Sequence, residues 1–351
     1  SSVNLPIGIA LLPIIFLVLL LSINVFIYGD DSLNGTNQFI LILSGLFGAS
    51  LGFIYKVSYK KILKSISNSV KSVTGALLIL LFVGALAGTW MISGVIPSMV
   101  YYGLKILDPN IFLPACVIIC SIISVATGSS WTTSATVGIA LVGIGKALGI
   151  PPGMVGGAVI AGAYFGDKLS PLSDTTNLAA AVTKVDLFKH IKYLTYTTIP
   201  SISITLIVFI ILGFLQVSNG STDNSYLLTA ITEKFNISLV LFIVPILVLI
   251  MIIKKTPPLI ALVIGTLVGA LFSIIFQPQI IAELSADSNS KLINTYVVIM
   301  DTITGPVSIE TNNAMLNDLF STGGMLGMMN TIFLVIGTMV FGGVMEAIGA
   351  L

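Results

Sequence analysis

The chain has 351 residues, of which 56% are hydrophobic and only 8% are charged, and its mean hydropathy is +1.09. A soluble domain carries about 25% charged residues, so this composition excludes a soluble globular protein and indicates an all-α polytopic membrane protein. All basic residues are lysines, and the formal net charge of +1 gives no reason to expect a nucleic-acid partner.

The first third of the chain contains three apolar segments that could each cross a bilayer, residues 5–28, 39–55 and 73–92. Between the second and the third lies a lysine-rich amphipathic stretch containing Lys56, Lys60, Lys61, Lys64 and Lys71. Because lysine-rich loops stay in the cytoplasm, this stretch and the N-terminus are predicted to be cytoplasmic. The third segment is expected to break around Ser93, Gly94 and Pro97.

Residues 111–149 contain two apolar arms around a polar centre. The arms, residues 111–126 and 132–148, would each be about 24 Å long as helices, slightly shorter than the ~30 Å hydrocarbon core. The centre, T-G-S-S-W at 127–131, is followed by more hydroxyl side chains. We interpret this pattern as a re-entrant hairpin whose tip approaches the bilayer middle from outside. The alternative is two ordinary spans joined by a surface turn.

Residues 166–177, G-D-K-L-S-P-L-S-D-T-T-N, are strongly polar but lie within apolar sequence. The uncharged run before them, residues 153–165, covers only about 20 Å as a helix, so the helix is predicted to stop inside the membrane. Pro171 cannot donate a backbone hydrogen bond, and Ser, Asp and Thr side chains compete with the helix for hydrogen bonds. Non-helical backbone at this depth must be buried in protein or line a polar cavity. We predict a broken helix over 153–182; the alternative is a polar loop at the interface.

Further spans are predicted at residues 199–217, 238–253, 258–276 and 326–348, with a long acidic outer segment before the last. From residue 238 the order of spans and amphipathic stretches repeats the start of the chain in the opposite orientation, which is typical of inverted-repeat secondary transporters. We therefore divide the chain into a first repeat (1–217), an outer linker (218–237) and a partial second repeat (238–351). A second hairpin and broken helix would follow Leu351, so we interpret the chain as truncated or as part of a longer protein.

Three segments resemble the NhaC family of Na+/H+ antiporters: S-S-W-T-T at 129–133, G-A-Y-F-G-D-K-L-S-P-L-S-D-T-T-N-L-A at 162–179, and D-L-F-K-H-I at 186–191. The resemblance implies an ion-coupled transporter of the bacterial inner membrane, with hairpins and an elevator-type motion, that carries Na+ and H+ and needs no cofactor. The sequence departs from the family at Ser129 and Thr132, because the family's tip is closer to G-T-S-W-G-T. The family's C-terminal polar stretch also has no counterpart here.

The chemistry of the polar stretches fits a sodium site. Hard cations prefer oxygen ligands, which a broken helix supplies as carboxylates, hydroxyls, an amide and freed carbonyls. A charged side chain at the bilayer centre costs about 2.5–3.5 kcal/mol, so an aspartate there indicates function. A carboxylate that holds either a proton or Na+ is sufficient for exchange. We predict Asp174 as this shared site and Asp167 as a second candidate. Lys168 could pair with either, and the alternative for Asp167 is a structural ion pair in place of an ion site. The predicted neighbours are Ser129, Ser130, Thr132, Ser170, Ser173, Thr175, Thr176 and Asn177.

Na+/H+ exchange is the leading hypothesis, and Na+-coupled malate–lactate antiport is the alternative, because NhaC relatives include such exchangers. An anionic substrate would require a cation or a helix N-terminus in the site. Lys168 is interpreted as the only internal lysine, and the chain has no arginine. An enzyme is not predicted, because the sequence has no metal-ligand spacing and no nucleophile–base pair. His190 is interpreted as a surface residue, Cys116 and Cys120 as small buried hydrophobes, and Glu346 as a weaker ion-site candidate. The expected environment is the lipid bilayer, with a homodimer as one hypothesis for assembly.

Overall fold

The computed structural model describes residues 6–350 apart from 107, 172, 174, 177–178, 181–184, 218–224, 255, 286–289 and 312–313. Seven of the described helices are long and apolar enough to cross a membrane, and the bent pair Ser225–Lys234 and Leu239–Ile252 could form an eighth span. The protein is therefore a multi-pass membrane protein. It divides into two compact units, Ser1–Leu81 with Met325–Leu351, and Phe82–Gly324.

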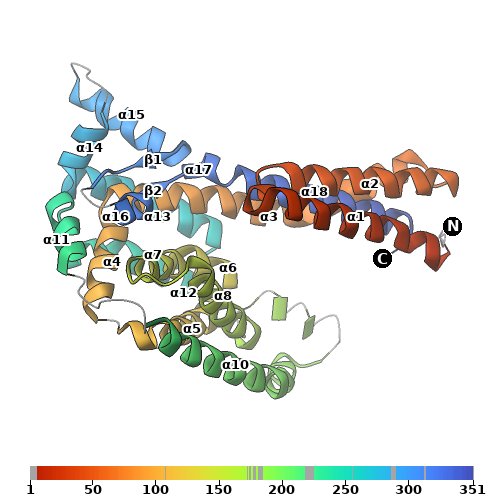
Figure 1. Ribbon diagram of the computed structural model, residues 1–351, viewed down its shortest axis with the longest axis horizontal. Coiled ribbons are helices and arrows are strands. Elements are labelled where there is room, and N and C mark those ends of the chain that lie inside the picture. Colours follow the sequence, from red (N-terminus) through yellow and green to blue (C-terminus); the bar gives the residue numbers. More distant parts are fainter. Residues whose placement is uncertain are drawn as a thin grey trace. The chain divides into compact units, whose positions relative to one another are not determined.

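The first unit is a helical bundle in which segments from both ends of the chain lie side by side (Figure 1). Small residues let two of its helices approach closely. A Cβ atom at Gly48 would lie 3.3 Å from Val344, and one at Gly52 would lie 2.7 Å from Ile348. The bundle consists of α1 (Ile7–Tyr28), η1 (Gly29–Leu33), α2 (Thr36–Ile54), the first part of α3 (Tyr59–Ile92) and α18 (Met329–Ala347).

Helix α3 differs from the prediction of a separate amphipathic stretch and span. It is one continuous helix of 34 residues from Tyr59 to Ile92. No proline lies near the join between the two predicted pieces. The one glycine close to it, Gly75, costs too little to end a helix. Packing also holds the lysine-rich part in place, because a Cβ at Gly343 of α18 would lie 2.6 Å from the Cα of Ile66. The Ser65 hydroxyl donates to the Glu346 carboxylate at 3.0 Å.

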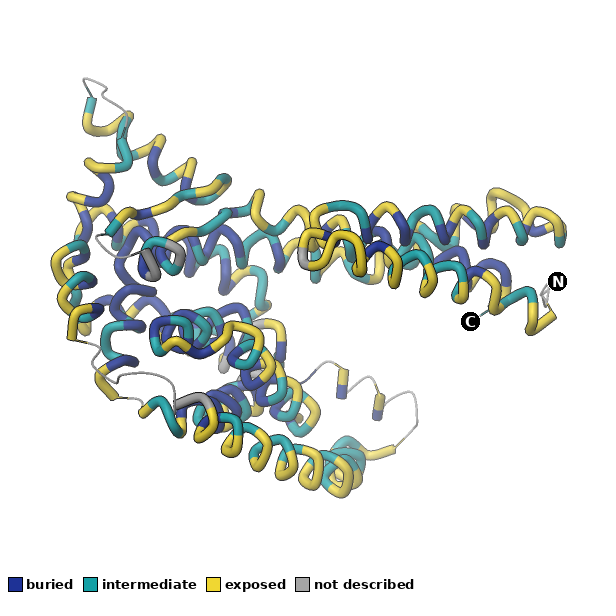
Figure 2. Tube along the Cα trace, in the orientation of Figure 1, coloured by how far each residue is buried: buried dark blue, intermediate teal, exposed yellow. Residues whose placement is uncertain are grey.

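In the second unit, three helices pack together: α5 (Pro109–Thr127), α8 (Pro152–Leu169) and α10 (Leu187–Val217). Helix α10 starts twelve residues before the predicted span at 199, so the lysines and His190 near its start are helical. Figure 2 shows the buried face of α8 and the more exposed surface of α10. Glycines allow α8 to lie almost directly on α5. A Cβ at Gly162 would lie 2.3 Å from the Val117 carbonyl oxygen.

Three interruptions between helices of this unit meet at Gln277, which is fully buried. Its side-chain amide donates to the Asn236 carbonyl at 2.9 Å and accepts from the Asn236 N–H at 3.0 Å. Gly94 has a φ of +81°, and a Cβ there would lie 2.3 Å from Gln277 Nε2. One amide therefore ties the end of α11 (Ser225–Lys234), the α3–α4 turn, and the junction between α13 (Pro258–Phe276) and α14 (Pro278–Leu284).

Between α5 and α8 lie α6 (Ser130–Thr133), the π-helical turn η2 (Ser134–Gly138) and α7 (Ile139–Ala147). The two strands pair antiparallel, Val307 with Thr322 and Ser308 with Ser321. The remaining elements are α4 (Val95–Ile106), η3 (Leu239–Phe242), α12 (Ile243–Ile253), α15 (Lys291–Thr304), β1 (Val307–Ser308), α16 (Ala314–Leu319), β2 (Ser321–Thr322) and, at the boundary of the unit, α17 (Gly324–Gly327).

Candidate functional site

Helix α8 carries Asp167 in its last turn and ends at Leu169. Gly166, Asp167 and Lys168 are still helical, so the helix continues four residues beyond the uncharged run that ends at Phe165. Pro171 explains the true end: the residue before a proline is driven out of the helical region. Ser170 accordingly has extended backbone with φ −81° and ψ 127°. The helix thus ends within the polar stretch, after 18 helical residues, about 27 Å.

The polar centre of 111–149 is a turn between helices. Helix α5 ends at Gly128, whose φ of +69° is the left-handed conformation that glycine adopts at helix ends. The second arm is not one uniform α-helix, because the π-helical turn interrupts it between α6 and α7. π-Helical turns occur frequently at functional sites. By length and hydropathy α5 could cross a membrane, whereas Ser134–Ala147 is shorter.

The structure brings this turn to the end of α8. The Ser130 hydroxyl donates a hydrogen bond of 2.9 Å to Oδ2 of Asp167, across 37 residues of sequence. Ser130 is only 5% exposed, and Asp167 is half-buried. The hydroxyl and the carboxylate thus share one partly buried position. Hydrogen bonds to a charged group are stronger than those between neutral groups, so this contact fixes the turn against the helix end.

Two further hydroxyl contacts attach α8 and the break after it to α5. The Ser170 hydroxyl donates to the Val125 carbonyl at 2.7 Å, and the Ser124 hydroxyl donates to the Ala163 carbonyl at 2.5 Å. Between them, Gly166 leaves no room for a side chain, because a Cβ there would lie 2.4 Å from the Ser121 carbonyl oxygen. The C-terminal half of α5 therefore forms one wall of the site.

Beyond Ser170 the chain turns back on the last turn of α8. The Ser173 N–H donates to the Ser170 carbonyl at 3.2 Å, and its hydroxyl lies 3.0 Å from that of Thr175. The Thr176 hydroxyl lies 3.3 Å from the carbonyl oxygens of both Asp167 and Lys168. Ser170, Ser173 and Thr176 are at most 4% exposed. Hydroxyl and carbonyl oxygens are thus gathered within a few residues of Asp167.

Six of the predicted site residues lie in this cluster: Asp167, Ser130, Ser170, Ser173, Thr175 and Thr176. Ser129 is next to it, and its carbonyl accepts from the Thr133 hydroxyl at 2.9 Å. Asp174, Asn177 and the side chain of Thr132 lie outside the described residues. The Lys168 side chain is exposed and forms no ion pair with a described carboxylate.

Sequence reasoning missed Ser124, whose contact with Ala163 joins positions 39 residues apart. It also did not assign a role to Thr133 and Thr136, which are 0% and 2% exposed. A hydroxyl residue within an apolar segment is a signal that could have identified all three residues. The sequence does not show, however, which face of α5 packs against α8. The polar turn was visible in the sequence, whereas its α5 wall was not.

The comparisons with known proteins agree on a family. The model of the Na+/H+ antiporter family matches residues 162–351, which include the break after α8. The chain is 40% identical over 339 residues to the malate-2H+/Na+-lactate antiporter of Bacillus subtilis, covering 96% of this chain and 68% of that protein. It is 36% identical over 311 residues to the Na+/H+ antiporter NhaC of Alkalihalophilus pseudofirmus, covering 89% and 64% respectively.

A further relative, an uncharacterized Na+/H+ antiporter of Haemophilus influenzae, is 34% identical over 342 residues, covering 97% of this chain and 70% of that protein. The chain thus spans about two thirds of the length of these relatives. No solved structure matches it significantly. The family match covers more than half of the chain and includes the residues around Asp167, and the relatives match along almost all of it. The chain therefore belongs to the Na+/H+ antiporter family.

Proposed function

We propose that the protein exchanges Na+ for H+ at the oxygen cluster around Asp167, with Asp174 as the carboxylate that holds either ion in turn. The hydrogen bond from Ser130 to Asp167 carries the proposal, because it joins the two polar stretches that sequence reasoning assigned to one site. The cluster offers a carboxylate, hydroxyls and backbone carbonyls, which are the ligands that a hard cation prefers. Asp174 lies seven residues after Asp167, beyond Pro171, within the same polar stretch.

The exchange follows from competition between the two ions. A carboxylate away from water is stable when it is protonated or when a cation compensates its charge, and unstable when it is bare. A transporter that moves only with its carboxylate occupied therefore returns a proton for each Na+ that it releases. The neighbouring hydroxyls of Ser130, Ser173 and Thr176 can serve both states, because a hydroxyl donates to a carboxylate and accepts from a cation.

An inverted repeat is part of the proposal, and matched contacts support it. Gly88 and Gly343 each precede by six residues a glycine with positive φ, Gly94 (+81°) and Gly349 (+75°). In this register Thr89 corresponds to Val344. A Cβ at Gly269 of α13 would lie 3.0 Å from Thr89, and one at Gly48 of α2 would lie 3.3 Å from Val344.

The amphipathic helices of the two proposed repeats also make matched contacts. A Cβ at Gly88 would lie 2.3 Å from the Thr302 carbonyl of α15, and one at Gly343 would lie 2.6 Å from Ile66 of α3. The third span of each proposed repeat thus contacts the second span and the amphipathic helix of the other. Inverted-repeat transporters alternate access by moving one part of the protein against another, and we propose an elevator-type motion here.

A bacterial inner membrane with a cytoplasmic N-terminus is the proposed location, since the lysines of α3 would then lie inside. A homodimer remains the hypothesis for assembly.

Malate–lactate antiport coupled to Na+ is the second candidate, favoured by the relative that is 40% identical. The described residues around Asp167 provide fewer ligands for an anion than for a cation. Lys168 is exposed, and the chain has no arginine that could bind a carboxylate at two points.

One experiment separates the two functions. Purified protein in proteoliposomes with a pH-sensitive dye inside is given Na+ alone, or Na+ with malate inside and lactate outside. Proton flux with Na+ alone supports Na+/H+ exchange, and flux only with the two acids supports the alternative. Flux in neither case contradicts the proposed function.

A further inference from the structure

One face of helix α15 is apolar and exposed. The opposite face holds Val298 and Thr302, which are 3% and 0% exposed. At 14 residues the helix is about 21 Å long, too short to cross a hydrocarbon core of ~30 Å. A short amphipathic helix whose apolar face is uncovered by described residues suits the membrane interface, where tyrosine is also enriched. The exposed apolar residues are Leu292, Ile293, Tyr296, Val297 and Met300.

A cavity of about 320 Å³ lies at the start of this helix, between α13, α14 and α15. Its lining has two parts of different chemistry. One part is apolar and consists of Ile274, Pro278, Ile281 and Ala282. The other is polar and consists of Ser285, Lys291, Asn294 and Thr295. A cavity that is apolar at one side and polar at the other fits an amphiphile better than a purely polar ion or a purely apolar molecule.

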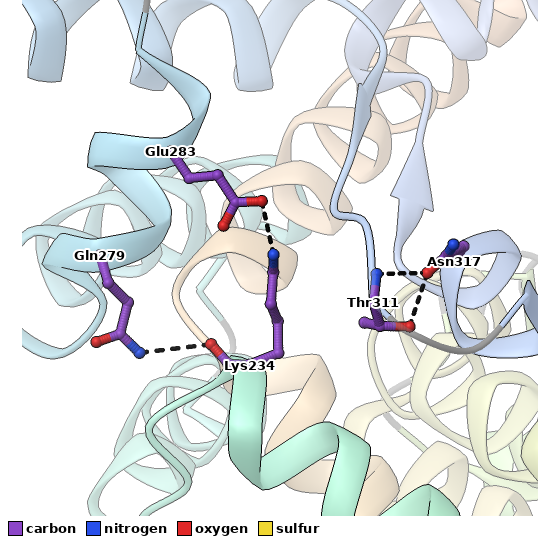
Figure 3. A network of polar contacts seen from close by, with 5 residues as sticks. All are labelled: Lys234, Gln279, Glu283, Thr311 and Asn317. Atoms are coloured by element: carbon purple, nitrogen blue, oxygen red, sulfur yellow. Dashed lines mark hydrogen bonds and ion pairs between the residues drawn. The ribbon is translucent and has the colours of Figure 1, made fainter.

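The polar part of the cavity contains one cationic side chain, that of Lys291. Lys291 is the first residue of α15, where the helix dipole adds positive potential. The nearest carboxylate along α14, Glu283, is turned to the Lys234 ammonium group at 2.6 Å (Figure 3). Gln279, one turn earlier, donates to the Lys234 carbonyl at 3.4 Å and strengthens the same α11–α14 contact. Among the described residues Lys291 has no ion-pair partner.

We propose that this cavity binds the phosphate of an anionic phospholipid, with the start of an acyl chain against its apolar part on α13 and α14. Lys291 and the first turn of α15 would bind the phosphate, while the hydroxyl and amide side chains would contact the glycerol and head group. Ile274 and Ile281 would contact the start of the acyl chain. The site is separate from the Asp167 cluster in sequence and requires only that the protein spans a membrane.

The test counts the lipids that the protein retains. The chain is purified from detergent containing equal amounts of phosphatidylglycerol and phosphatidylcholine, and bound lipids are counted by native mass spectrometry. We expect wild type to retain phosphatidylglycerol in preference. Lys291→Glu should lower its retention at least about fivefold, which corresponds to the contribution of about 1 kcal/mol per lysine at an anionic surface. Lys254→Glu, the same change at an exposed lysine outside the cavity, should retain the wild-type amount.

Three outcomes would overturn the proposal. The first is that wild type and Lys291→Glu each retain phosphatidylglycerol and phosphatidylcholine in equal amounts. The second is displacement of phosphatidylglycerol by millimolar inorganic phosphate, which would identify a free-anion site. The third is efficient cross-linking of a Tyr296→Cys variant between two copies in a bilayer, which would make the exposed face of α15 a protein interface and remove the premise that this helix lies at the membrane interface. Lys291→Gln, which removes the charge and keeps most of the side-chain length, guards against misfolding of the reversed variant and should retain less phosphatidylglycerol as well.

Discussion

Ser130 and Asp167, 37 residues apart in the sequence, are joined by a hydrogen bond of 2.9 Å from the serine hydroxyl to carboxylate Oδ2. The bond lies where the turn after α5 meets the last turn of α8. Ser130 is buried, so water does not compete freely for the carboxylate at this point. A cation at Asp167 would therefore also be within reach of the Ser130 hydroxyl.

Removing the Ser130 hydroxyl should weaken sodium binding. A hydrogen bond to a charged group contributes about 1.5–3 kcal/mol, so Ser130→Ala should raise the Na+ concentration for half-maximal proton flux about tenfold or more. Ser121→Ala is the matched control, because among the described residues its hydroxyl bonds to the Val117 carbonyl of its own helix alone, at 2.6 Å. Flux assays in proteoliposomes measure both. Equal sodium dependence of the two variants would remove Ser130 from the site.

Asp174→Asn should abolish Na+-dependent proton flux while the protein still inserts and folds. The amide keeps the shape and one oxygen ligand but cannot exchange a proton. Asp186→Asn serves as the control: Asp186 accepts from the Lys189 N–H at 3.0 Å near the start of α10, and asparagine performs this capping role equally well. Full activity of reconstituted Asp174→Asn protein would contradict its assignment.

Close packing of α5 on α8 should depend on Gly166. A methyl group there would meet the Ser121 carbonyl oxygen at 2.4 Å and Ser124 Cβ at 2.6 Å, so the helices must separate. Overpacking of this kind costs about 1–3 kcal/mol. Gly166→Ala should lower the melting temperature in detergent and disturb the Ser124–Ala163 contact. Gly156→Ala, on the same helix with nothing within 4 Å, should be neutral or slightly stabilising. Equal melting temperatures for the two variants would argue against this packing.

Sequence reasoning located elements best where proline and polar residues mark both ends. The predicted span 258–276 coincides with α13, which starts after Pro257 and ends before Gln277 and Pro278. It failed where no such residue stands, as in the continuous α3, because helix propensity changes little between its amphipathic and apolar parts. Around the site, the polar residues were recognised from their cost in a membrane. Their partners Val125 and Ala163 were not, because a backbone carbonyl carries no sequence signal.

The orientation of the chain in the membrane should determine which introduced cysteines react with an impermeant thiol reagent. If the lysine-rich part of α3 is cytoplasmic, Lys60→Cys should resist an impermeant thiol reagent added to intact cells, because the membrane separates the two. Asn219→Cys, in the predicted outer linker, should react under the same conditions. The native cysteines are buried and should contribute little background. The reverse pattern would invert the proposed orientation and leave the ion site unaffected.

Sodium should protect the turn at Ser130 from chemical modification. Replacing the hydroxyl with a thiol puts a reactive group 2.9 Å or slightly more from the Asp167 carboxylate, where a bound cation would cover it. Ser130→Cys should therefore react slowly with a small permeant thiol reagent, and more slowly still with Na+ than with an equal concentration of choline. The buried Cys116 and Cys120 are replaced by alanine in all variants so that only the introduced thiol can react. Trp131→Cys is the comparison, since that neighbouring side chain is 49% exposed and should react regardless of sodium. Rapid modification of Ser130→Cys that is indifferent to Na+ would place the turn at the membrane surface and separate it from the ion site.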